Sequence, residues 1–180
     1  MRIRTHHSLS LDGYSATAEG FPAITQVTEF APKKTHGIPE FGVECPAVAM
    51  GRTTFEPAIG NPWWPWPDRW VYVLSSRELP AGTPEDVVHV TGGPDALLER
   101  LRSENIDGDV ELLGGPSLIR AFWQRHAIDQ LGLVLLPILL GGGLQLFPLD
   151  AGHGLSHLRL VGQKTHPDGA LELFYERSEA

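Results

Sequence analysis

The sequence predicts a single α/β domain built on a mostly parallel sheet. Its 180 residues are close to the length of one domain, and they suffice to bury a core without a metal or a disulfide. Short apolar runs alternate with helical patterns, and the runs at 87–90 and 110–113 each lead through a Gly-Gly turn into a helix. That order is typical of parallel strands joined by helical crossovers. We find no boundary that would divide the chain, so we expect one domain over residues 1–180.

The first half is predicted to contain two strands behind a long loop. Segment 20–44 should hold a helix around 25–30 and then a Pro- and Gly-rich loop at 32–42, a length of loop that often covers a site. The apolar runs at 46–50 and 70–74 read as buried strands.

The second half is predicted to contain two helices and a terminal hairpin. The helical patterns at 94–101 and 116–122 each begin with a proline, which the first helical turn tolerates, and each gathers its large apolar residues on one face. The strand-like runs at 158–161 and 171–175 flank a turn at 166–169 whose last residue is a glycine. We expect these two strands to pair antiparallel.

Charge and composition exclude several classes of partner. Lysine and arginine number 14 and aspartate and glutamate 22, which gives a net charge of −8. Such a chain repels nucleic acid and anionic membranes unless positive charge is gathered locally. We therefore expect a small-molecule substrate and neither nucleic acid nor membrane as a partner.

The single cysteine and the apolar tracts suggest a cytoplasmic protein. Cys45 cannot form an intramolecular disulfide, and we interpret it as a small buried filler. The longest apolar tract, 131–140, is interrupted by glycine and proline and is too short to span a membrane. The charged first residues are not followed by the apolar stretch of a signal peptide.

Common enzyme signatures are absent from the sequence. We find no dinucleotide-binding Gly-x-Gly-x-x-Gly after a strand, no P-loop, no His-Glu-x-x-His and no Gly-x-Ser-x-Gly. His153 and His157 lie four apart near Asp150, but glycines around them argue against a helix, so we predict a polar loop and no metal.

A tryptophan cluster has two interpretations. Trp63, Trp64, Trp66 and Trp70 lie in a proline-rich segment, where they could form the wall of a pocket for a flat ligand or pack the loop onto the sheet or a dimer partner. We favour the packing role.

Three turns that follow predicted strands each carry groups suited to a phosphate-rich ligand. Glycines let the backbone approach an anion, hydroxyls and guanidinium groups bind it, and a helix N-terminus attracts it. In an open α/β sheet the carboxyl ends of the strands form the ligand site, so the three turns should converge. The predicted binding residues are Gly51, Arg52, Thr53, Thr54, Ser75, Ser76, Arg77, Gly114, Gly115, Pro116 and Ser117. From the residues alone, the turn at 92–94 is an equally good phosphate turn.

The ordered set of motifs resembles a known family. The chain is similar to the dihydrofolate-reductase-like superfamily, and within it to the group named after the C-terminal reductase domain of the riboflavin-biosynthesis deaminase-reductase. The resemblance covers nearly the whole chain and implies a three-layer α-β-α domain, with a mixed, mostly parallel sheet of about eight strands and a C-terminal antiparallel hairpin. The motifs that carry it are Ser10-Leu11-Asp12-Gly13-Tyr14, Met50-Gly51-Arg52-Thr53-Thr54-Phe55-Glu56, Val73-Leu74-Ser75-Ser76, Leu113-Gly114-Gly115, 137–143 and Leu146-Phe147.

This resemblance implies NADPH as the hydride donor. By position, Arg52 to Thr54 would meet the cofactor phosphates, with Arg52 at the 2′-phosphate. Ser75 to Arg77 would line the adenosine end, and Gly114 to Ser117 would hold the pyrophosphate, which favours Gly114 over Gly92.

The same resemblance makes Asp12 the candidate catalytic residue, beside the nicotinamide end, where it could bind substrate or pass a proton. A role as a turn-former before Gly13 is equally open, and Glu29 and His36 are weaker candidates for the catalytic role. Folate reductases carry a carboxylate just after a Pro-Ala pair in the first helix, whereas here Ile24 follows Pro22-Ala23, which argues against folate.

The sequence therefore predicts an NADPH-dependent reductase that transfers a hydride to a C=N or C=O bond of a small substrate, heterocyclic or ribosyl-linked and resembling a ribosylaminopyrimidine or a pterin. The alternative is a non-catalytic NADPH-binding sensor or assembly module of the same fold. A third hypothesis is a flavin binder that uses the tryptophan cluster. The apolarity of 131–140 suggests a homodimer.

Overall fold

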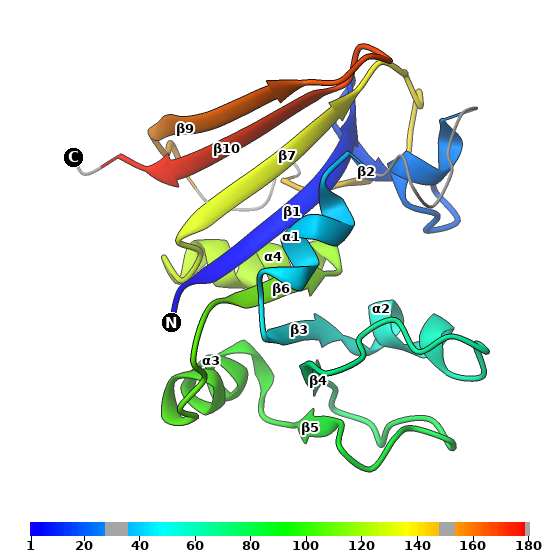
Figure 1. The fold of residues 1–180 in the computed structure, drawn as a ribbon, viewed down its shortest axis with the longest axis vertical. Helices are drawn as coiled ribbons and strands as arrows, with labels where there is room; N and C mark the ends of the chain where they lie inside the picture. The colour runs from blue at the N-terminus through cyan, green and yellow to red at the C-terminus, as the bar shows by residue number, and fades with distance from the viewer. Residues whose placement is uncertain (28–35, 148–153, 179–180) are drawn as a thin grey trace.

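The computed structural model describes residues 1–27, 36–147 and 154–178, and one eight-stranded sheet runs through them (Figure 1). The strands lie in the order β5-β4-β3-β6-β1-β7-β10-β9. The six from β5 to β7 are parallel to their neighbours, whereas β10 is antiparallel to β7 and β9. The prediction of a mixed, mostly parallel sheet closed by a terminal hairpin is confirmed. The strands of this sheet are β1 Ile3–Ser10, β3 Ala47–Gly51, β4 Trp70–Leu74, β5 Val88–Val90, β6 Val110–Gly114, β7 Gln130–Leu136, β9 Leu158–Thr165 and β10 Leu171–Arg177.

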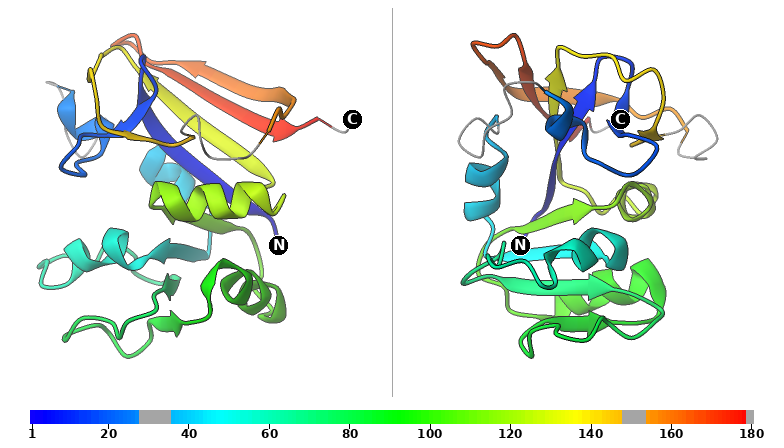
Figure 2. Two further views of the ribbon diagram at one scale, coloured as in Figure 1. Left: turned by 180° about the vertical axis from the view of Figure 1, so that it is seen from behind. Right: turned by 90° about the vertical axis from the view of Figure 1, so that its right-hand side faces the viewer.

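Helices cover both faces of the sheet, and a second, two-stranded sheet lies near the carboxyl end of the central strand β1. Helix α1 lies on one face and α3 and α4 lie on the other (Figure 2). The small sheet pairs β2 (Tyr14–Ala16) with β8 (Leu144–Gln145). The helices are α1 Ile38–Val43, α2 Arg52–Phe55, α3 Gly93–Ser103 and α4 Pro116–Gln124, with 3-10 turns η1 Ala23–Gln26 and η2 Glu56–Ala58.

Strand β1 lies inside the sheet although most of its residues are polar. It pairs with β6 on one side and with β7 on the other. Its buried hydroxyls bind the backbone: the Thr5 hydroxyl donates to the Leu112 carbonyl at 2.8 Å, and the Ser8 hydroxyl accepts from the Ile24 N–H at 3.2 Å. Because each hydroxyl has a partner, its burial costs little. Our sequence analysis assigned no strand there, since it looked for apolar runs.

The main core fills the space between the sheet and helices α3 and α4. Leu101, Ile119 and Phe122 from the helices are fully buried against Ala49 and Leu112 of the sheet. Burying each large side chain contributes about 1.5–3 kcal/mol, so the two helices predicted from apolar periodicity are held mainly by this face.

The tryptophan segment packs onto the sheet beside α2. The Phe55 and Trp66 rings stack with centroids 6.2 Å apart, and Trp64 meets Trp66 edge-on at 5.2 Å. The packing role is confirmed for Trp64 and Trp66. Trp63 and Trp70 are exposed, with relative accessibilities of 80% and 61%.

Two predicted segments differ from the structure. Helix α1 (Ile38–Val43) occupies the second half of the predicted loop 32–42 and extends one residue beyond it, and the predicted helix around 25–30 is replaced by the 3-10 turn η1, as far as Val27. The rest of that predicted helix, and His153 with Asp150, lie outside the described residues. Strand β7 (Gln130–Leu136) is internal to the sheet, so burial alone accounts for the apolarity of this tract.

Cys45 is fully buried, as expected of a filler, and burial raises the pKa of its thiol to about 11. Within residues 1–27, 36–147 and 154–178, no helix has the length and apolarity needed to cross a bilayer, and no cluster of three metal-ligating side chains occurs.

Arg69 and Glu111 form a buried ion pair that ties β4 to β3 and β6. The guanidinium donates to Glu111 Oε2 at 2.8 Å and to the carbonyls of Cys45 and Ala47. Glu111 is 2% exposed, and burial raises the pKa of its carboxyl above the usual value despite Arg69. Removing one partner of such a pair leaves the other as an uncompensated buried charge.

We predict that Arg69→Ala lowers the free energy of unfolding by about 3–5 kcal/mol, measured by urea denaturation at pH 7. The loss should shrink as the pH falls, because the raised pKa lets Glu111 take up a proton and the neutral carboxyl needs no cation. Arg159→Ala is the control, since Arg159 pairs with Glu176 on the surface and should cost about 1 kcal/mol or less. Equal losses in the two variants would contradict the role of the buried pair.

Candidate functional site

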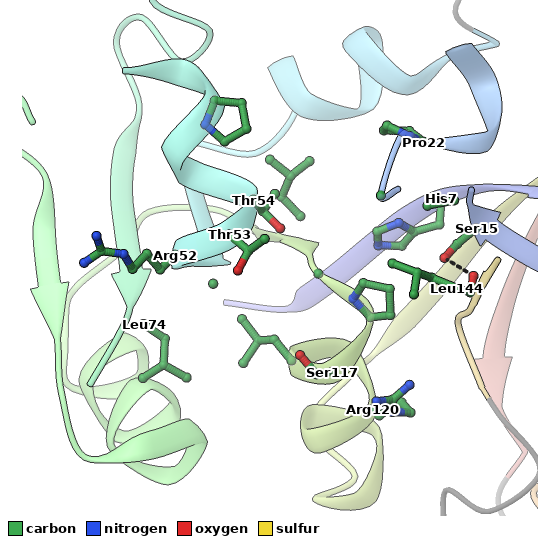
Figure 3. Close-up of a pocket in the computed structure, with 18 of the residues that line it drawn as sticks. His7, Ser15, Pro22, Arg52, Thr53, Thr54, Leu74, Ser117, Arg120 and Leu144 are labelled. Carbon is green, nitrogen blue, oxygen red and sulfur yellow. Dashed lines mark hydrogen bonds between the residues drawn. The ribbon is translucent and has the colours of Figure 1, made fainter. Parts of the chain in front are cut away.

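The three predicted turns meet along one groove of about 1540 Å³ (Figure 3). They follow β3, β4 and β6, which are neighbours in the sheet, so the carboxyl ends of these strands lie side by side. Ten of the eleven predicted binding residues line the groove, and Gly114 is buried directly behind it. The lining members are Gly51, Arg52, Thr53, Thr54, Ser75, Ser76, Arg77, Gly115, Pro116 and Ser117.

The turns after β3 and β6 approach each other at glycines. A Cβ on Gly115 would lie 3.4 Å from Thr54 Oγ1, and one on Gly51 would lie 3.8 Å from the Gly114 carbonyl oxygen. Gly114 has φ +127°, which only glycine adopts readily, and its peptide bond to Gly115 is cis. The middle of the groove is therefore walled by backbone, which can approach a ligand closely.

Helix α4 begins at this glycine turn. Gly115 is its N-cap, Pro116 occupies the first turn, and no side chain caps the helix within the part of the chain that the structure describes. The positive end of the helix dipole and the exposed Ser117 hydroxyl thus face the groove. This end of α4 is suited to an anionic group.

The turn after β4 is stiffened by its own serine. The Ser75 hydroxyl accepts from the Arg77 N–H at 3.0 Å and donates to the Arg77 carbonyl. Ser75 is therefore engaged in the turn, and Ser76 and Arg77 are the exposed members. Gly93 and Pro94 also line the groove, and β5, which precedes them, neighbours β4. The two Gly-Gly-Pro turns thus serve different parts of one groove.

Positive charge is gathered at the groove. Arg52, Arg77 and Arg120 line it, and Glu19 is the only carboxylate among the described lining residues. Arg52 is held in place, because its Nε donates to Glu56 at 2.6 Å and another nitrogen donates to the Glu78 carbonyl. A protein of net charge −8 thus presents a locally basic surface that favours an anionic ligand.

The other half of the groove comes from segments that our sequence analysis did not assign. It is formed by β2, the 19–22 loop and β8, and the Ser15 hydroxyl ties β2 to the Leu144 carbonyl at 2.9 Å. At Gly143 a Cβ would lie 2.1 Å from the Ala16 carbonyl oxygen, so β2 and β8 pair only because a glycine is there. The Gly-Gly-Gly run at 141–143 was the one local signal of this approach.

His7 on β1 is a lining residue that our sequence analysis missed. Its ring lies between the two halves (Figure 3), and its Cε1 is 3.5 Å from where a Gly114 Cβ would be. Burial lowers the pKa of His7 to about 4, although the Leu112 carbonyl acts in the opposite direction. The imidazole is therefore neutral at pH 7, and its Nε2 has no hydrogen-bond partner in the described residues.

Asp12, the candidate catalytic residue, is engaged elsewhere. Its carboxylate accepts from the backbone N–H groups of Leu140 and Gly141 at 3.1 and 2.7 Å, and it is not among the lining residues. A hydrogen bond from Ser10 and these two N–H groups hold its pKa below the usual value. Asp12 thus fastens the turn after β1 to the loop after β7, and it lies outside the groove that the predicted binding residues line.

The weaker candidates do not reach the groove either. His36 pairs with Asp168 at 2.6 Å and is not among the lining residues, while Glu29 lies outside the described residues. None of Trp63, Trp64, Trp66 and Trp70 lines this groove, so the tryptophan cluster is not part of the site that the three turns form.

Comparisons with known proteins agree with this architecture. The profile of the RibD C-terminal domain family matches residues 2–171. An uncharacterized protein, YwjB of Bacillus subtilis strain 168, is 30% identical over 95% of both chains. A solved structure from Shewanella sp. PV-4, to which a role in riboflavin biosynthesis has been attributed, superposes with a TM-score of 0.82 and 23% identity over 99% of this chain and 100% of that one. Dihydrofolate reductase from Enterococcus faecalis, complexed with NADP(H) and RAB-propyl, gives a TM-score of 0.67 and 16% identity over 99% and 97%.

Proposed function

The chain belongs to the RibD C-terminal domain family, and we propose that it is an NADPH-dependent reductase. Its family and its dihydrofolate-reductase-like fold are those of reductases, which makes an oxidoreductase the natural class. The proposed substrate is a small heterocycle or ribosyl-linked compound with a C=N or C=O bond. When bound, NADPH would supply the hydride, and the protein would supply orientation and electrostatics.

The observation that carries the proposal is the meeting of three phosphate-suited turns in one groove. Arg52 and Arg77 lie at the end formed by α2 and the β4 turn, where a 2′-phosphate would find two guanidinium groups. The Gly115 backbone and the N-terminus of α4 follow in the middle, where a pyrophosphate would bind. This order along the groove matches the order of phosphates in NADPH.

The other half of the groove then receives the substrate. Tyr14, Phe21 and Leu144 give it an aromatic and apolar wall against which a flat ring can pack. Ile24, which stands where folate reductases carry a carboxylate, is buried in η1. A pterin would therefore lack its usual acidic partner, which favours a ribosyl-linked heterocycle over folate.

A non-catalytic NADPH-binding module is the second candidate. The observation in its favour is that Glu19 is the one carboxylate among the described lining residues and that Asp12 is engaged elsewhere. A binding module needs no proton donor at the site, whereas a reductase must obtain a proton from a lining side chain or from water.

We further propose a cytoplasmic location and a homodimer. One buried thiol suits a reducing compartment. Strand β9 forms the edge of the sheet, and Leu158, Leu160 and Val161 on it are 37–44% exposed. An open apolar edge of this kind favours pairing with a second copy.

The proposal is tested by titrating the protein with NADPH and NADH, and then by following the loss of NADPH absorbance. The substrate panel should contain ribosylaminopyrimidines, pterins and quinones. We expect NADPH to bind at least about tenfold more tightly than NADH, and a ribosyl-linked heterocycle to be reduced. NADPH binding without turnover of any substrate would favour the binding module, and absence of NADPH binding would refute both.

Arg52→Ala should weaken NADPH binding by about tenfold or more while changing NADH binding by less than about twofold, because only NADPH has a 2′-phosphate for the guanidinium. Arg102→Ala on the exposed side of α3 is the control and should change neither affinity. Dissociation constants from calorimetry provide the measurement. Equal weakening of the two cofactors would contradict the role assigned to Arg52.

Light scattering should give twice the 19.7 kDa of one chain at micromolar concentration. Val161→Lys, which places a charge on the open edge of β9, should shift the protein toward the monomer. A wild-type species of 19.7 kDa would refute the homodimer.

A further inference from the structure

Three histidines and two carboxylates gather on the face of the sheet that α1 covers (Figure 2). His6 belongs to β1, His36 precedes α1, His166 and Asp168 lie in the turn between β9 and β10, and Glu172 belongs to β10. These five residues form the histidine cluster. None of them lines the groove, and they make no metal site in the part of the chain that the structure describes. The proposed reductase function therefore does not account for them.

Two imidazole–carboxylate pairs hold the cluster together. His36 Nε2 donates to Asp168 Oδ2 at 2.6 Å, and His166 Nε2 donates to Glu172 Oε2 at 3.2 Å. The rings of His36 and His166 meet edge-on, with their centroids 4.8 Å apart. The start of α1 is thus fastened to the turn between β9 and β10.

His6 is the member of the cluster that has no hydrogen-bond partner. Its side chain is fully buried, and neither ring nitrogen makes a hydrogen bond within the described residues. Glu172 Oε1 lies 3.4 Å from Nε2. Phe41 of α1 and Phe174 of β10 contact the ring, with centroids 5.0 and 5.2 Å from its own. Helix α1 therefore covers a titratable side chain with an aromatic ring.

The surroundings of His6 disfavour a proton on its ring. Burial has the largest effect, and the positive charges that His7, Arg4 and His166 can carry act in the same direction, so the pKa of His6 is lowered to about 3. Strand β7 carries no charged residue. His6 is therefore neutral at pH 7 in the folded protein. The other charged or titratable groups on the elements packed around the ring are Glu172 on β10, Lys164 opposite it on β9, Asp168 and His36 of the cluster, and Glu40 and Glu44 at α1, of which Lys164, Glu40 and Glu44 are exposed.

Helix α1 depends on this cluster for its attachment. Its six residues are too few for a helix that is stable alone, and Phe41 is the only buried side chain, glycine aside, that the structure describes in it. His36 and Gly37 have φ values of +54° and +79°, a conformation that is strained for histidine. A Cβ on Gly37 would lie 2.5 Å from Glu172 Oε1, so the close approach of the chain to this carboxylate requires glycine. Opening of α1 would relieve the strain at His36.

We propose that α1 is an acid-released cover over His6, whose opening is coupled to the uptake of one proton from solvent by the uncovered imidazole. The imidazolium then stands beside the Glu172 carboxylate in the presence of water, whereas in the closed form it would be a buried charge. The same face of β1 carries Ser8, which binds the Ile24 N–H of η1, and the 19–22 loop before η1 lines the groove. The cover thus lies next to a segment that supports one wall of the groove. This inference does not rest on the proposed function.

The direction of the pH effect follows from the two states of His6. An uncovered histidine binds a proton below about pH 6.5, whereas the covered one does so only below a pH of about 3. Between these values the open form binds more protons, so its population rises as the pH falls. Asp168 keeps its charge over this range: burial raises its pKa, but the hydrogen bond from His36 outweighs burial and holds the pKa below its usual value.

The test is amide hydrogen exchange of the full chain at pH 7 and pH 5, expressed as protection factors so that the intrinsic pH dependence of exchange is removed. The Phe41 N–H, which donates to the Gly37 carbonyl at 2.9 Å, reports the opening of α1, and the N–H groups of β3 report the opening of the sheet. From pH 7 to pH 5 the protection of Phe41 should fall about 25-fold more in wild type than in His6→Gln, which cannot take up the proton. His157→Gln removes an exposed histidine outside the cluster and is the matched control, which should behave as wild type does.

Two results would overturn the inference. One is the same pH dependence of Phe41 protection in wild type and His6→Gln. The other is a Phe41 N–H that is protected as strongly as β3, because α1 would then open only together with the whole domain. If His6→Gln does not fold, nuclear magnetic resonance of wild type decides: the ring nitrogens of His6 should report a neutral imidazole in the folded protein at pH 5, and a His6 that titrates near its ordinary pKa in the folded protein would overturn the inference.

Discussion

The groove depends on the close contact between the turns after β3 and β6. Parallel pairing of β3 with β6 fixes the ends of these strands side by side, and their turns meet at Gly51, Gly114 and Gly115, of which Gly114 has a φ of +127° that favours glycine. A side chain on Gly115 would extend from the lining of the groove, where it would fill space that a phosphate chain requires. The contact thus joins the two best anion-binding elements of the chain into one surface. The turn after β4 and the β2–β8 sheet extend that surface at its two ends.

A polar strand beside this contact is the second constraint. β1 carries His7 to the middle of the groove while its hydroxyls are buried. Such a strand is stable at the centre of a sheet because Thr5 and Ser8 find backbone partners on β6 and η1. Apolar residues at these positions would also pack, but they would leave the Ile24 N–H without its acceptor. The polarity of β1 therefore helps to position η1, which lies next to the substrate half of the groove.

The sequence was informative where structure is determined locally. Glycine and proline after an apolar run indicate a strand-to-helix turn whatever the rest of the chain does, and the turns at Gly51 and Gly114 were found in this way. The sequence was uninformative where contacts between distant segments determine a residue's environment. The environment of β1 depends on β6 and β7, and the role of Asp12 depends on N–H groups 128 and 129 residues away. The lining residues His7 and Arg120 belong to no local motif, because what brings them into the groove is the packing of segments far apart in the sequence.

The distribution of arginine partners suggests how an acidic protein can accommodate an anion. Away from the groove, carboxylates neutralise most guanidinium groups, as Glu111 does for Arg69 and Asp95 does for Arg125. The chain thereby keeps its net negative charge over much of its surface, which disfavours nonspecific polyanions. At the groove this neutralisation is incomplete. Arg77 and Arg120 lack carboxylate partners in the described residues, and Arg52 pairs with a single carboxylate, that of Glu56. The electrostatic potential in the groove is then set by a few unpaired guanidinium groups, while the surrounding acidic surface repels anions. Such an arrangement selects small anions that fit the groove over large ones that must contact the acidic surface.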